Sequence, residues 1–219
     1  MTTYTSIGEM KLVGGELCLD FINTVGARVN VGEERNWRKQ PVSILRDKIN
    51  GYADLVTWGR HTGLLTEREA QRLRQRAEVE TEEAASVLRR AITLREAVYQ
   101  IFRATIDGHQ PPALSLEMLN EEVSIARSHE RVAYTSAGFT WQWDNRGEFL
   151  DSVLWSVARS ATTFLTSGDL SRVKRCYGDE CGWLFVDTSK NRSRQWCDMQ
   201  DCGNLAKVRR FRRKQRETE

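Results

Sequence analysis

The chain has 219 residues, of which 40% are hydrophobic and 29% charged, enough for one domain or for a medium and a small one. The net charge is only +3, but residues 172–219 hold 13 Lys/Arg against 7 Asp/Glu, and the rest of the chain is slightly acidic. The chain starts without a signal-peptide pattern and has no apolar run near 18 residues. These features exclude a membrane-spanning helix and predict a cytoplasmic protein with reduced thiols.

The first segments of the chain show mixed patterns. Residues 14–25 form an apolar run with Asp20, Asn23 and Thr24 set into it, which suits a strand or a buried helix, and we favour the helix. Residues 28–40 are polar and predict a loop. From Tyr52 to Gly59 the apolar positions follow helical spacing, and Gly63 supplies a stop.

The middle of the chain predicts a long helical region. Residues 66–69, Thr-Glu-Arg-Glu, fit a capping box, and helical periodicity then continues to about residue 107. Forty residues is long for one helix, so we expect a break near residue 80. Ser115 is expected to cap a further helix that buries apolar residues at four positions: Leu116, Leu119, Val123 and Ala126.

A change of period follows. Apolar residues alternate on both sides of residues 136–138, which predicts a β-hairpin, and a last helix is expected from about Glu148 to Ser167. No low-complexity linker follows Gly168, so the next domain is expected to pack directly on this one. The predicted fold is therefore mainly α (α+β). A helical domain with a β-hairpin spans residues 1–170, and a small domain with a basic helix spans residues 171–219.

Four of the five cysteines lie in the small domain, in the order Cys176-x4-Cys181-x15-Cys197-x4-Cys202. Two close pairs joined by a loop are what a tetrahedral ion needs, and four thiolates favour zinc. Four sulfurs leave no position for a water, so the single Zn²⁺ is predicted to be structural and to supply folding free energy of about 10 kcal/mol. Iron held by four thiolates is the minor alternative.

The remaining cysteine and the histidines have simpler interpretations. Cys18 lies in an apolar run and is expected in the core. His61, His109 and His129 are remote from the cysteine pairs in sequence and are expected at the surface or in loops.

After Cys202 the chain predicts a basic helix over residues 203–216, with Leu205, Val208 and Phe211 as a narrow apolar stripe. Val208 and Phe211 are expected to face inwards. Residues 205–216 hold seven cations and no acid, which favours an anionic partner, DNA above all. The alternative is a solubilising or disordered basic end. The candidate nucleic-acid contacts are nine: Arg175, Arg192, Arg194, Lys207, Arg209, Arg210, Arg212, Arg213 and Lys214.

The segment 175–204, with Arg-Cys-x4-Cys at its start and Trp-Cys-x-Met-x2-Cys-Gly-Asn at its end, resembles the CGNR zinc finger. Gly-Gly-Glu-Leu-Cys-Leu-Asp-Phe-Ile-Asn-Thr at 14–24 and Leu-Arg-Glu-Ala at 94–97 resemble the ABATE domain, the usual companion of that finger. The resemblance implies a bacterial, stress-linked transcription regulator with a DNA-binding zinc finger. The last letter of the motif should be arginine, but residue 205 is leucine, so any contact made by that arginine is missing here.

A regulator needs an input. Asp20, Asn23 and Arg95 are hypothesised to meet in a polar pocket that binds a small-molecule effector. The alternative is a structural hydrogen-bond network, with Asp20 paired to Arg95 or capping a helix.

Other function classes have less support in the sequence. No phosphate loop, nucleophile elbow or zinc-protease motif occurs, so we predict no enzymatic activity and no catalytic residues. A protein- or RNA-interaction module built on the finger is the alternative to a DNA-binding regulator. A homodimer is compatible with paired half-sites on DNA, although no heptad pattern supports it.

Overall fold

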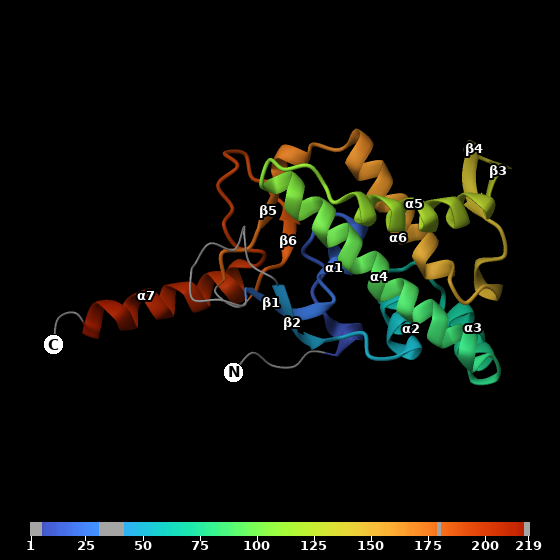
Figure 1. Cartoon of the computed structure of the whole chain (residues 1–219), viewed down its shortest axis with the longest axis horizontal. Coiled ribbons are helices and arrows are strands. Elements are labelled where there is room, and N and C mark those ends of the chain that lie inside the picture. The colour runs from blue at the N-terminus through green and yellow to red at the C-terminus, as the bar shows by residue number, and fades with distance from the viewer. Residues whose placement is uncertain (1–5, 31–41, 179–180, 217–219) are drawn as a thin grey trace.

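The computed structural model describes residues 6–30, 42–178 and 181–216, and the chain is mainly helical, as predicted. The first part begins with a short 3-10 helix at Ile7–Glu9 and a buried helix, α1 (Leu17–Ile22). The longer helices follow in chain order: α2 (Tyr52–His61), α3 (Glu67–Val79), α4 (Thr81–Ile106), α5 (Ala113–Ser128) and α6 (Ser152–Ser167). Figure 1 shows α4 running through the body with the other helices beside it.

The strands form three separate antiparallel pairs. They are β1 (Val25–Asn30) with β2 (Val42–Asp47), β3 (Glu130–Thr135) with β4 (Gly138–Trp143), and β5 (Val173–Arg175) with β6 (Leu184–Val186). Short 3-10 helices occupy residues 146–148 and 170–172. A π-helical turn, Met199–Gly203, leads into the last helix, α7 (Asn204–Arg216).

The helices bury one large apolar cluster. α4 contacts α1, α2, α3, α5 and α6, and α1 packs against α6 as well. Five of the six α1 residues are buried, among them Cys18 in the core position expected of it. Burial raises the pKa of the Cys18 thiol to about 12, so it stays protonated at neutral pH.

Local sequence signals place most helix boundaries correctly. The Thr66 hydroxyl accepts a hydrogen bond from the Glu69 amide at 3.3 Å, and the Glu69 carboxylate accepts one from the Thr66 amide at 2.7 Å. The helical region breaks at Glu80, as expected. Gly63 ends the turn after α2 with a φ of 76°, a left-handed conformation that favours glycine.

Four sequence predictions about the N-terminal 170 residues and their helices and strands need correction. Ser115 lies inside α5 and does not cap it, because the helix begins right after Pro112. Leu116 is exposed, one position off the buried face that holds Leu119. The last long helix starts at Ser152, since residues 146–148 form a separate 3-10 turn.

The fourth correction concerns the predicted loop at 28–40. Residues 28–30 belong to β1, which forms an unpredicted hairpin with β2, and residues 31–41 lie outside the described residues. The polarity of residues 28–40 hid this strand. Its inward position is taken by Arg28, a charged side chain that is only 1% exposed and is balanced by Glu96.

Candidate metal centre

The four cysteines of the small domain come from three turns. Cys176 follows β5, Cys181 lies in the turn before β6, Cys197 precedes the π-helical turn, and Cys202 lies within that turn. Their sulfur atoms all lie within 4.8 Å of one another. The Sγ atom of Cys197 is 3.6 Å from that of Cys181 and 3.7 Å from that of Cys202. All four are free thiols, so the cluster is not a pair of disulfides.

These distances fit one zinc ion. A tetrahedron with Zn–S bonds of about 2.3 Å has S···S edges of about 3.8 Å. The amides of Gly178 and Cys197 donate hydrogen bonds to Cys176 Sγ at 3.4 and 3.3 Å, which favours a thiolate there. The cluster is therefore compatible with a single structural Zn²⁺, and no carboxylate or histidine belongs to it among the described residues.

The electrostatics of the cluster also favour a cation. Hydrogen bonds from Cys181, Cys197 and Cys202 lower the pKa of the Cys176 thiol. The hydrogen bond to Cys176 in turn raises the pKa values of Cys181 and Cys197, because one thiolate opposes the next. A divalent cation removes this conflict, since it stabilises all four thiolates at once.

Asp187 organises the loop between the two cysteine pairs. Its carboxylate is fully buried and accepts hydrogen bonds from Lys174 Nζ at 2.6 Å, from Ser189 Oγ at 2.6 Å and from the Arg194 amide at 3.0 Å. Burial alone would raise the pKa of Asp187, but these donors hold it well below its usual range. The sequence pattern gave Asp187 no role, and its spacing two residues before Ser189 was the available signal.

Arg194, a predicted nucleic-acid contact, instead holds the metal loop. Its Nε donates to the Trp196 carbonyl at 2.9 Å, its Nη2 donates to the Cys197 carbonyl, and its guanidinium lies 4.4 Å from the ring centroid of Phe185. Phe185 is itself fully buried against the cysteines. The side chain thus fixes the backbone beside one sulfur and does not extend towards a ligand.

The zinc cluster packs directly on the N-terminal helical domain. The Asn23 side chain donates to the Leu184 carbonyl at 2.8 Å and accepts from the Leu184 amide at 3.0 Å, as a neighbouring strand would. The Arg28 amide donates to the Cys181 carbonyl at 3.0 Å. Trp183 Nε1 donates to the Val25 carbonyl at 2.8 Å. These contacts join α1 and β1 to the backbone that carries the sulfurs.

Two further contacts show how close this docking is. Gly182 has a φ of 69°, and a Cβ at this position would lie 2.6 Å from the Arg28 carbonyl oxygen, so a side chain is excluded there. On the other side of the cluster, Lys11 forms ion pairs with Asp198 at 2.7 Å and Asp201 at 2.8 Å. Both acids raise the pKa of Lys11, which therefore stays charged.

The three residues predicted to share an effector pocket have different partners. The Asp20 carboxylate accepts a hydrogen bond from the Gly14 amide at 2.8 Å, and burial raises its pKa to about 6. Asn23 binds the zinc domain, as described above. The alternative pairing of Asp20 with Arg95 is wrong, because Arg95 pairs with Asp47.

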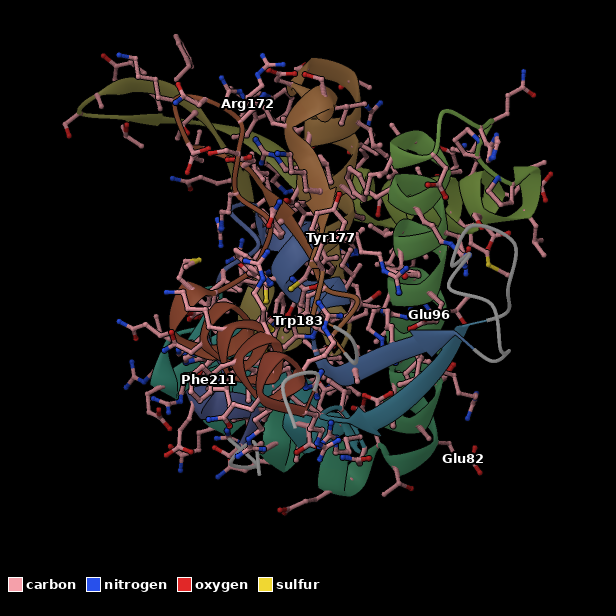
Figure 2. All side chains as sticks on the ribbon, turned by 90° about the vertical axis from the view of Figure 1, so that its left-hand side faces the viewer. Glu82, Glu96, Arg172, Tyr177, Trp183 and Phe211 are labelled. Atoms are coloured by element: carbon pink, nitrogen blue, oxygen red, sulfur yellow. The ribbon has the colours of Figure 1, made fainter. Side chains whose placement is uncertain are left out.

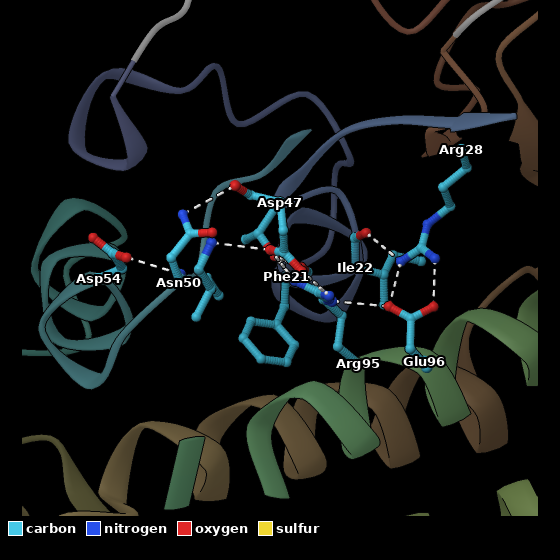
Figure 3. A network of polar contacts seen from close by, with 10 residues as sticks. Phe21, Ile22, Arg28, Asp47, Asn50, Asp54, Arg95 and Glu96 are labelled. Atoms are coloured by element: carbon cyan, nitrogen blue, oxygen red, sulfur yellow. Dashed lines mark hydrogen bonds and ion pairs between the residues drawn. The ribbon is translucent and has the colours of Figure 1, made fainter. Parts of the chain in front are cut away.

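Arg95 instead centres a buried network between α4 and the first hairpin (Figure 3). Its guanidinium, fully buried, binds both Asp47 oxygens at 2.7 and 2.6 Å and Glu96 at 2.9 Å. Arg28 binds Glu96 and the Ile22 carbonyl. Burial alone would raise the pKa of Asp47, but Arg95 lowers it. Each buried arginine in this network is thus paired with a carboxylate, which is a structural role. Binding of a small-molecule effector remains a prediction.

The other predicted nucleic-acid residues fall into two groups. Arg175 is partly buried towards α4 and Tyr99, where burial lowers its pKa, and Arg192 binds Ser171 Oγ at 3.1 Å and Asp169 at 3.4 Å. The remaining six lie on α7, which projects from the body in Figure 1: Lys207, Arg209, Arg210, Arg212, Arg213 and Lys214, the last outside the described side chains.

The apolar stripe of α7 is exposed. Leu205 and Val208 are each 46% exposed and Phe211 is 63% exposed, so the expectation that Val208 and Phe211 face inwards is wrong. Figure 2 faces the side from which α7 projects and labels Phe211 on that helix. The pattern defined the stripe correctly, but the main contact of α7 among the described elements is with the π-helical turn before it, and the three stripe residues are exposed.

A mainly helical domain with a docked four-cysteine cluster defines the chain as a zinc-finger protein. The ABATE family, described as "Putative stress-induced transcription regulator", matches residues 15–168, and the CGNR zinc finger matches residues 172–215. The chain belongs to the ABATE family and carries a CGNR zinc finger. Neither description is that of an enzyme.

Two further findings concern the whole protein and its helices. A search of curated proteins finds no match to the chain. Among the described helices, none is both long enough and apolar enough to cross a membrane.

Proposed function

We propose that this protein regulates transcription by binding DNA through α7, which the zinc cluster holds at a fixed position on the helical domain. The carrying observation is that α7 projects from the body with seven cations and no acid among residues 204–216. An isolated helix of like charges repels itself, so an anion along it would stabilise it. Phosphates are the anions that such a surface attracts most strongly.

The zinc cluster supplies the orientation in this proposal. Cys202 lies in the turn that becomes α7, and Lys11 binds Asp198 and Asp201 around the same turn. Movement of α7 is thereby restricted at its first turn. Leu205 stands where the family motif has arginine, so the proposed contacts begin two residues later, at Lys207.

Fluorescence anisotropy with zinc-loaded protein and labelled duplex DNA tests this proposal across a range of salt concentrations. The slope of log K against log salt should fall by about 0.9 for each phosphate contact removed. The double variant Arg210→Gln/Arg212→Gln should therefore flatten the slope by about 1.8. The matched control is Arg68→Gln/Arg72→Gln on α3, which removes two exposed cations elsewhere.

A chain ending after Asn204 provides a second comparison. If it binds DNA with the same slope as the full chain, α7 is not the contact and the proposal fails. Duplex RNA in the same assay separates the two nucleic acids.

The exposed stripe of Leu205, Val208 and Phe211 favours one alternative, a protein partner that covers α7. Such binding would involve apolar burial and would depend little on salt. Co-purification that persists at high salt and is lost on Phe211→Ser would support this alternative; loss at high salt would argue against it.

Effector sensing by the helical domain is a separate proposal. Asn23 and Arg28 both contact the backbone of the zinc domain. A ligand that binds near α1 would act through these contacts on the position of the finger. A thermal-shift screen of small polar metabolites is the test. A metabolite that raises Tm in the parent but not in Asp20→Asn supports it, and a screen without any shift counts against it.

A further inference from the structure

The β3–β4 hairpin carries an apolar face that is exposed among the residues described by the structure. On one face, Val132 pairs with Trp141 and Tyr134 pairs with Phe139 across the strands. Val132 is 58%, Tyr134 77%, Phe139 80% and Trp141 55% exposed. The rings of Tyr134 and Phe139 pack edge to face with centroids 5.1 Å apart. These four side chains are called the hairpin patch below.

Within the described ranges 6–30, 42–178 and 181–216, this face is covered only at its base. Trp143 and Glu130, the next pair on this face, lie against α6, where Trp143 is 5.7 Å from the Trp155 ring centroid and Glu130 forms an ion pair with Arg159 at 3.1 Å. Beyond this pair the hairpin extends past the helix. A two-stranded hairpin is marginally stable in water unless another layer covers its apolar face. The outer half of the hairpin therefore lacks the layer that its inner half has.

Composition limits the kind of partner. The twelve residues 132–143 contain no charged side chain, in a chain that is 29% charged. Interface cores are depleted in charge and enriched in Tyr, Trp and Phe, and the patch has all three. A phosphate backbone or a charged peptide would find no charged group on the hairpin patch. An equally uncharged apolar surface would match it, and a second copy of the chain provides one.

The area is also adequate for a dimer. From the exposed fractions, the four side chains offer about 500 Å² per copy, since each large aromatic side chain can bury 150–250 Å². Two such faces would bury about 1,000 Å², the lower limit for a specific interface, before the hairpin turn and the base contribute. Soluble monomers seldom expose a contiguous apolar patch larger than a few hundred Å².

We propose that two copies of this chain associate through the hairpin patch, face to face about a two-fold axis. In this arrangement the Tyr134–Phe139 pair near the tip of one hairpin lies over the Val132–Trp141 pair of the other. Figure 1 places the hairpin and α7 at opposite ends of the long axis of the molecule. The dimer therefore leaves both α7 helices accessible, and the proposal does not depend on DNA binding.

Sedimentation of the full-length zinc-loaded protein tests the proposal. The 25.2 kDa chain should sediment with twice that mass at about 100 μM, where an interface of this size is populated. Tyr134→Thr/Phe139→Thr keeps residues that favour strands and should raise the dimer dissociation constant at least about tenfold. The control Val79→Thr/Leu114→Thr removes two exposed apolar side chains elsewhere and should leave it unchanged.

Two results would overturn the proposal. One is a monomeric parent protein at the highest concentration; the other is a hairpin variant that dimerises as tightly as the parent. Hydrogen exchange of the unmodified protein gives an independent check, free of any folding defect in the variant. Amides of residues 130–143 should exchange more slowly at high than at low concentration, and equal rates would contradict the proposal.

Discussion

The helical domain and the zinc domain are stabilised in different ways. The helical domain buries a single apolar cluster to which all of α1 to α6 contribute. The zinc domain buries only Cys176, Phe185 and Cys197 as its own small cluster, and the rest of its stability comes from metal ligation and docking. A segment of this size cannot bury enough apolar surface to fold alone. The helical domain should therefore survive loss of the finger, and the finger should not survive loss of the metal.

Metal removal should give the largest difference in stability between the two domains. A strong chelator, or Cys197→Ser, should remove about 10 kcal/mol of folding free energy from residues 173–216. Proteolysis should then cut this segment, while the circular dichroism of α1 to α6 persists. Cys18→Ala is the control and should leave one zinc per chain by elemental analysis. A finger that keeps its protease resistance after complete metal removal would refute the structural role of zinc.

Within the helical domain, the largest loss of stability is expected from substitution of Arg95. Arg95→Met keeps the volume but leaves Asp47 without its bidentate partner, and breaking a buried pair in this way costs about 3–5 kcal/mol. In a chain of this size the melting temperature should fall by roughly 10 °C. Arg131→Met breaks a pair whose arginine is 65% exposed and should leave the melting temperature almost unchanged. Equal losses from the two variants would contradict a structural network.

The boundary between the two regions can be tested at Asn23. Asn23→Ala leaves the buried amide and carbonyl of Leu184 without partners, at a cost of about 1–3 kcal/mol. Because the docked backbone carries the sulfurs, zinc should also transfer faster to a chelator. Asn50→Ala, at an exposed position, is the comparison variant. An unchanged transfer rate in Asn23→Ala would show that docking and metal binding are independent.

The smallest expected effect is local to one helix. Thr66→Ala removes the hydroxyl that caps α3 and should cost about 1 kcal/mol, or about 2–4 °C in melting temperature. Thr166→Ala, at an exposed position inside α6, should be neutral. If both variants melt alike, the capping box does not contribute to stability.

The sequence predicted features that depend on neighbours along the chain. The capping box at Thr66, the break at Glu80 and the alternation of the β3–β4 hairpin are all confirmed. Each rests on contacts three or four residues apart or on a short turn, so its geometry follows from spacing. The β1–β2 hairpin was missed because its strand carries a buried arginine, which ordinary patterning assigns to a loop.

The metal centre likewise combines features that the sequence determined with features that it did not. The spacing of Cys176, Cys181, Cys197 and Cys202 by itself determined that the four sulfurs could gather around one ion. Only the tertiary structure decided which polar side chains serve that cluster. Asn23 reaches Leu184 across more than 150 residues, and Arg194 binds its own metal loop although its charge suggested an external ligand. Residue type gives the bonds that a side chain can form, whereas packing of distant segments decides which partner is within reach.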